Sequence, residues 1–156
     1  MRQREEVNSP LMVTRDCSAT PEQVWAVIAD GWTYSQWVVG NSRMRAVDAD
    51  WPAPGSKIHH TIGIWPLSIN DVTVVEACTP RRELVLHAKT RPFGGARITL
   101  RLKASATGCR IEMSEVPVDG PLNLVPRRLA LAAAWPRNRE CTWRLAAHAE
   151  RRTQPE

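Results

Sequence analysis

The histidine at position 60 is the side chain of this sequence best placed for acid–base chemistry, because it lies in an alternating apolar segment. Successive side chains of a strand point to opposite faces, so His60 shares a face with Ile58 and Ile62. His59 points the other way, and the two adjacent histidines therefore do not chelate one metal ion together. A histidine on an apolar face is more often a hydrogen-bonded core residue than a catalytic base, and both interpretations stay open here.

Glu115 is the second candidate for an acid or base, since the same alternation places it beside Ile111 and Met113. A carboxylate near the end of a strand can also simply reach water or an arginine. Asn138 lies on the apolar face of a helical segment, where it orients a ligand or satisfies backbone groups near Pro136. Asp71 faces either the same space or the outside, because Val72, Val74 and Val75 do not follow one alternation, as happens at a β-bulge.

The sequence lacks the residue patterns that nucleophilic catalysis, metal binding or phosphate binding would require. The sequence contains no nucleophile–base pair, no metal-binding triad and no phosphate-binding glycine loop. Four cysteines, Cys17, Cys78, Cys109 and Cys141, match no metal-binding spacing, and we expect them to be reduced and mostly buried. We therefore expect no metal and no cofactor.

The elements that position these residues read as an antiparallel meander. Turn residues separate strand-length runs at Lys57–Ile62, Ser68–Cys78, Glu83–Thr90, Ala96–Ala104 and Cys109–Val116. Within the fourth run, aliphatic residues alternate with polar ones, so one face of the sheet is apolar and the other polar. Before the meander, the sequence predicts a strand over 11–17, a helix begun by Thr20 and Pro21, a further helical turn over 33–37 and a weak strand over 43–50.

An apolar sheet face must be covered, and the C-terminal segment is the amphipathic helix that could cover it. Pro136 either kinks one long helix or begins a second. At 100° per residue, one face contains Leu131, Trp135, Asn138, Thr142, Leu145, Ala146 and Ala149, and the opposite face contains Arg137, Glu140, Arg144 and Arg151.

Composition and charge narrow the class of protein. We expect a single domain over residues 1–156, with a core at 11–152 and flexible ends at 1–10 and 153–156. Neither a secretory signal nor a transmembrane segment is predicted, so we expect a cytoplasmic protein. The net charge of +5 arises between residues 127 and 152, which favours either plain solvation or an anionic partner. No nucleic-acid-binding motif is present.

The stretches SATPEQVWAVIADGWTYSQWVVG, VDADWPAPGSKIHH, GIWPL and RNRECTWRLAAHAE resemble the START/Bet v 1-like (SRPBCC) superfamily, in its bacterial polyketide cyclase/dehydrase-like branch. The resemblance implies an α+β helix-grip fold. In it, a curved seven-stranded antiparallel sheet wraps around a long C-terminal helix, with two short helices after the first strand and a hydrophobic cavity. Members bind lipids, sterols or polyketides, and a minority are cyclases or dehydratases.

From the residues and the resemblance together, we expect a monomer or homodimer that binds an apolar small molecule, such as a lipid or polyketide, in this cavity. One alternative is a polyketide cyclase or dehydratase that uses His60 or Glu115 as acid or base. Another is an interaction module that uses the arginine-rich C-terminal helix. The expected lining of the cavity comprises Trp37, Ile58, His60, Trp65, Ile98, Leu100, Met113, Asn138, Thr142 and Leu145.

Overall fold

The computed structural model of the protein describes residues 12–90 and 94–152, so the ends expected to be flexible, 1–10 and 153–156, lie outside the described residues. Within that part the elements are β1 (Val13–Cys17), α2 (Pro21–Ala29), η1 (Gly31–Thr33), α3 (Tyr34–Trp37), β2 (Asn41–Val47), β3 (Lys57–Ile62), β4 (Ile69–Thr79), β5 (Glu83–Thr90), β6 (Gly94–Ser105), β7 (Gly108–Asp119), η2 (Pro121–Leu124) and α4 (Arg127–Arg152).

The strands form the expected antiparallel sheet. The described strands pair in the order β1-β7-β6-β5-β4-β3-β2. Strands β2 to β7 therefore form a continuous meander, and β1 pairs with β7. Several predicted boundaries were wrong by one to three residues, and β7, for example, continues through Pro117 to Asp119 instead of ending at Val116. Pro117 lacks an N–H, and it is accommodated opposite Ala96, next to a register shift between Gly95 and Ala96. The weak strand predicted over 43–50 lies two to three residues earlier, as β2.

The helix after β1 starts as its sequence predicts. The Thr20 backbone N–H donates to Gln23 Oε1 over 2.8 Å, and the Gln23 backbone N–H donates to Thr20 Oγ1 over 3.3 Å. This reciprocal capping box satisfies two donors that the first helical turn would otherwise leave unpaired. The helix then turns its buried side chains, Val24, Val27 and Ile28, toward the core.

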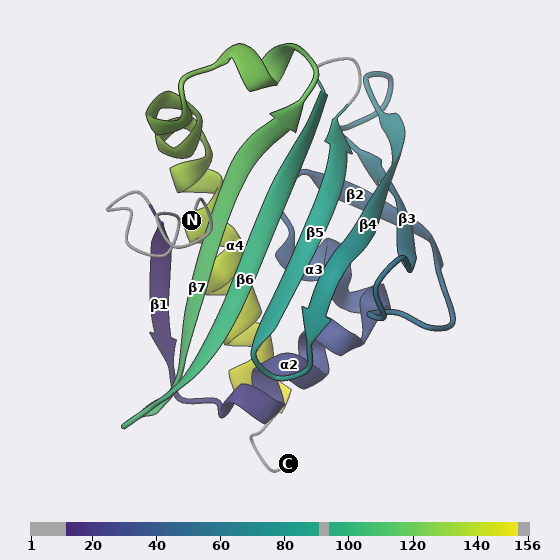
Figure 1. Cartoon of the computed structure of the whole chain (residues 1–156). Helices are drawn as coiled ribbons and strands as arrows, with labels where there is room; N and C mark the ends of the chain where they lie inside the picture. The colour runs from purple at the N-terminus through teal and green to yellow at the C-terminus, as the bar shows by residue number, and fades with distance from the viewer. Residues whose placement is uncertain (1–11, 91–93, 153–156) are drawn as a thin grey trace.

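Helix α4 covers the apolar face of the sheet, which Figure 1 shows with α4 crossing behind β5, β6 and β7. It is one helix with Pro136 inside it, rather than two. The predicted inner face is buried with one exception: Trp135 is 36 % exposed, and the Arg139 guanidinium lies 5.3 Å from its ring centroid. The buried residues are Leu131, Asn138, Cys141, Thr142, Leu145, Ala146 and Ala149.

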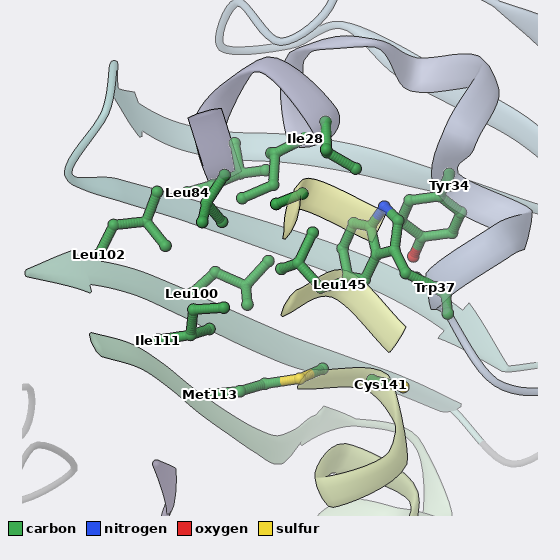
Figure 2. Packing of buried hydrophobic residues seen from close by; sticks show 14 of the residues in the cluster. Ile28, Tyr34, Trp37, Leu84, Leu100, Leu102, Ile111, Met113, Cys141 and Leu145 are labelled. Atoms are coloured by element: carbon green, nitrogen blue, oxygen red, sulfur yellow. The ribbon is translucent and has the colours of Figure 1, made fainter. Parts of the chain in front are cut away.

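The core fills the space between the sheet, α2 and α4. Figure 2 shows aliphatic side chains of the sheet, such as Leu100 and Ile111, packed toward Leu145 of α4 and Ile28 of α2, with Trp37 beside them. Of the four cysteines, Cys17, Cys109 and Cys141 are buried, Cys78 is half-buried, and all four are free thiols. Among the described helices, none combines the length and the apolar composition of a membrane span.

The contact between α4 and the sheet predicts a difference between two leucines of the same helix. Replacing Leu145, which is fully buried, by Ala should lower the free energy of unfolding by about 2–5 kcal/mol, because the substitution removes buried methyl groups and leaves a cavity. Leu129→Ala, at a position 62 % exposed, should change it by less than about 0.5 kcal/mol. Urea denaturation of both variants checks this, and equal losses would show that α4 does not cover the sheet as described.

Candidate ligand pocket

A pocket of about 290 Å³ opens between the sheet and the first half of α4, at the end of the sheet where β3 ends and β6 begins. Its floor comes from inward-facing strand residues, and its walls come from the turn after α3, from η2 and from α4. The lining residues are Tyr34, Val38, Val39, Gly40, Asn41, His60, Ile62, Thr73, Ala88, Ala96, Glu115, Leu122 and Arg137.

His60 is the centre of a buried polar cluster on the wall of this pocket. It is 3 % exposed, and its Nε2 atom lies 2.8 Å from Thr73 Oγ1 on the neighbouring strand. The Tyr34 hydroxyl is also hydrogen-bonded to Thr73, and the Tyr34 and His60 ring centroids lie 5.6 Å apart. The other ring nitrogen of His60, Nδ1, is buried and has no hydrogen-bond partner among the described residues. The cluster therefore uses one nitrogen of the imidazole and leaves the second unsatisfied.

Burial decides the charge of this cluster. Burial first, and then the nearby Arg45, His59 and Arg137, together lower the pKa of His60 from 6.5 to about 4. Burial also raises the pKa of Tyr34 to about 12. At neutral pH both side chains are uncharged, so His60 offers either an N–H or a lone pair to a ligand, according to its tautomer.

Glu115 and Arg137 form an ion pair on another wall of the pocket. Arg137 Nη1 lies 2.6 Å from Glu115 Oε2, and Arg137 Nε donates to the Val39 carbonyl oxygen over 3.1 Å. Burial is the largest single influence and disfavours the charge of Arg137, but Glu115, Cys141 and Tyr34 together outweigh it, and the pKa of the guanidinium is raised. The placement of Arg137 on the outer face of the helix was wrong. It lies at the edge of that face, one turn before the buried Cys141, and its long side chain reaches inward.

The residues predicted to line a cavity lie in three different places. Of that set, only His60 lines the pocket, together with the second acid–base candidate, Glu115. Trp65 is 83 % exposed in the turn between β3 and β4, and it does not line the pocket. Asn138 is buried, and its Oδ1 atom has no partner among the described residues. The remaining residues are buried and are not part of the lining: Trp37, Ile58, Ile98, Leu100, Met113, Thr142 and Leu145. A role for any of them in binding stays a prediction.

The polar lining residues that sequence reasoning missed are Tyr34, Asn41, Thr73 and Arg137. Thr73 could have been found by alternation if the bulge in β4 had been placed correctly. The register shift falls between Val75 and Ala77, after Thr73 rather than near Asp71. Asp71 therefore pairs with His60 across the two strands and is buried, and its Oδ1 atom accepts a hydrogen bond from the Val72 N–H over 2.7 Å.

The buried His60 predicts a specific loss of stability in acid. The unfolded chain binds a proton on this residue near pH 6.5, whereas the folded protein binds it only near pH 4. The unfolded state therefore gains protons first, and stability falls as the pH decreases through this window, by roughly 3 kcal/mol in total. His60→Gln removes this pH-dependent contribution to the free energy of unfolding, because glutamine does not titrate. Denaturation measured at several pH values should show the stability advantage of the wild type over His60→Gln shrinking between pH 6.5 and pH 4. Parallel curves would contradict the account.

Comparison with known structures supports the fold. Three crystal structures are similar: a protein from Nitrosomonas europaea (TM-score 0.67, 15 % identity, 91 % of this chain and 94 % of that chain), a protein from Rhodobacter sphaeroides (0.67, 22 %, 90 % and 91 %) and Ara h 8.0201 (0.68, 10 %, 90 % and 96 %). At these identities the likeness shows the fold alone. No match was found among curated proteins.

The comparison of the sequence with family models identifies the family, which the fold alone does not. A family model described as polyketide cyclase / dehydrase and lipid transport matches residues 11–150. This match, with the helix-grip arrangement of α4 and the sheet, confirms the resemblance to START/Bet v 1-like proteins. The chain belongs to the polyketide cyclase / dehydrase and lipid transport family.

Proposed function

We propose that the pocket binds a small, largely apolar molecule through a hydrogen bond to His60 Nδ1. The observation that carries the proposal is this buried nitrogen, which lacks a partner among the described residues and belongs to a residue on the pocket wall. An unsatisfied buried polar atom costs about 1–3 kcal/mol, and a ligand atom that satisfies it recovers that cost. Apolar side chains from several sides of the pocket, including Val38, Ile62 and Leu122, supply the remaining contacts.

The charges in the pocket indicate which polar group the ligand carries. Glu115 and Arg137 neutralise one another, and His60 is uncharged at neutral pH, so the pocket offers no unbalanced charge to an ionic group. A hydroxyl or carbonyl group fits the neutral imidazole better than a carboxylate or an amine does. The volume of about 290 Å³ lies near the lower limit for small-molecule sites, which favours a compact ligand or one part of a longer molecule that extends through the mouth.

The alternative is an enzyme, a polyketide cyclase or dehydratase, in which His60 or Glu115 acts as acid or base. Its support is that His60, Thr73 and Tyr34 form one connected group of exchangeable protons beside the pocket. A histidine with a pKa of about 4 is a weak base at neutral pH and is not protonated there, and Glu115 is engaged by Arg137. Binding without catalysis therefore agrees better with these residues.

The arginine-rich C-terminal helix stays a third candidate, for an anionic partner. Besides Arg137, two more of its arginines are already paired: Arg144 Nε lies 2.9 Å from Glu140 Oε1, and Arg152 Nη2 lies 3.3 Å from Asp30 Oδ2. These pairs reduce the charge available to a partner, so no contact in the structure favours this function over ligand binding.

Filling the pocket should prevent binding. Ala88 lines the pocket, and Ala88→Leu places three more carbon atoms in its space. We expect the enhanced fluorescence of the neutral apolar probe N-phenyl-1-naphthylamine on the wild-type protein to fall at least about fivefold in this variant, because the probe loses its site. The matched control is Ala77→Leu, at an exposed position of the adjacent strand, which should bind as the wild type does. Equal binding by all three proteins would contradict the proposed site.

The two leading functions differ in what happens to an added polyketide. If the protein only binds, a linear poly-β-ketone incubated with it should be recovered with its mass and absorption spectrum unchanged apart from the background reaction. Chromatography with mass detection provides the measurement. Cyclised or dehydrated product that disappears with His60→Gln, while circular dichroism shows that the variant is folded at the assay temperature, would establish the enzyme instead.

A further inference from the structure

Two segments beside the pocket expose large apolar side chains to solvent. In the turn between β3 and β4, Ile64, Trp65 and Leu67 are 82–84 % exposed. After β7, Leu124 is 87 % exposed and Leu129 is 62 % exposed. Scattered exposed leucines are common, but side chains of this size that gather around one opening are a feature of interaction sites. We call these five residues the apolar rim.

The rim lies around the mouth of the pocket. Ile62, the last residue of β3, lines the pocket and comes two residues before Ile64. Leu122 of η2 also lines the pocket and comes two residues before Leu124. Figure 1 shows the turn between β3 and β4 and the η2 segment at the same end of the sheet, the upper end in that view. A surface that contacts the rim therefore also covers the pocket mouth.

The charges near the rim indicate what kind of surface that is. The stretches 62–69 and 120–139 contain no Asp or Glu, and the second contains four arginines. Arg128, directly before Leu129, is exposed, and so is Arg43 on β2, opposite Thr61 near the end of β3. A second copy of this chain would bring two positive rims together, which disfavours self-association. These features match a membrane surface that contains anionic lipids: the segments combine apolar side chains and a tryptophan with arginines that have no acidic neighbours in sequence.

We propose that the apolar rim docks the protein on an anionic lipid bilayer, with the pocket mouth against the membrane. Trp65 and its neighbours insert at the level of the lipid headgroups, and Arg128 contacts lipid phosphates. The bilayer then supplies or receives the apolar ligand without exposing it to water. Docking itself does not depend on the ligand, but this last step rests on the proposed function.

Vesicle co-sedimentation tests the docking. Wild-type protein should sediment with mixed phosphatidylcholine–phosphatidylglycerol vesicles and much less with phosphatidylcholine alone, and added salt should weaken the association. Trp65→Ser should reduce the partition coefficient for the mixed vesicles about tenfold, since the variant lacks the aromatic side chain that inserts into the bilayer. Arg128→Gln should reduce it for the mixed vesicles only.

The matched control is Trp32→Ser. Trp32 is also an exposed tryptophan, at 56 %, but it lies in η1, whose Gly31 is next to Val47 at the opposite end of β2 from the pocket. This variant should sediment as the wild type does. Ala88→Leu should also keep its vesicle binding, because position 88 lies inside the pocket, so a failure of docking and a failure of ligand binding can be told apart.

Two outcomes would overturn the proposal. The wild type does not sediment with the mixed vesicles, or Trp32→Ser loses as much binding as Trp65→Ser. If the wild type does not sediment with lipid but forms a dimer in analytical ultracentrifugation that Trp65→Ser dissociates, the rim is an interface between two copies of the chain.

Discussion

The apolar inner face of the sheet must be covered, and the extent of that cover shapes the rest of the molecule. Antiparallel strands put Ile98, Leu100 and Leu102 on one face, and α4 supplies the side chains that exclude water from it. Leu145 and Ala149, both fully buried, belong to the part of α4 where this packing is complete. Around Arg137, in the first half of α4, the packing is incomplete, and the pocket lies there.

The border between the packed part of the core and the pocket explains why polar residues gather at the pocket. Groups such as His60 and Thr73 would be costly within the packed part of the core, and here they are paired with one another or with the backbone. The ion pair of Arg137 with Glu115 connects α4 to β7 across this opening, with a further hydrogen bond to the Val39 carbonyl oxygen in the turn after α3. The pocket is therefore a built feature of the fold, with His60 Nδ1 as the one imidazole nitrogen that the described residues leave for a ligand.

Alternation in the sequence was sufficient to predict the sheet, its apolar face and the inward direction of His60 and Glu115, because a strand has a strict two-residue period. It could not separate pocket residues from packed ones. Met113 and Glu115 share a face of β7, yet only Glu115 lines the pocket, since that depends on where α4 and η2 lie. Arg137 was misplaced because helical angles describe the backbone and take no account of side-chain length. Trp65 illustrates the same limit in a turn, where no period determines direction.

The central claim is that the opening between the sheet and α4 holds a guest molecule that engages His60. The most direct test is a crystal structure of protein purified from its native cells without detergent. The account predicts electron density that protein atoms do not explain, between Ile62 and Leu122 and within hydrogen-bonding distance of His60 Nδ1. A map in which the protein's own side chains fill that volume and satisfy Nδ1 would contradict it.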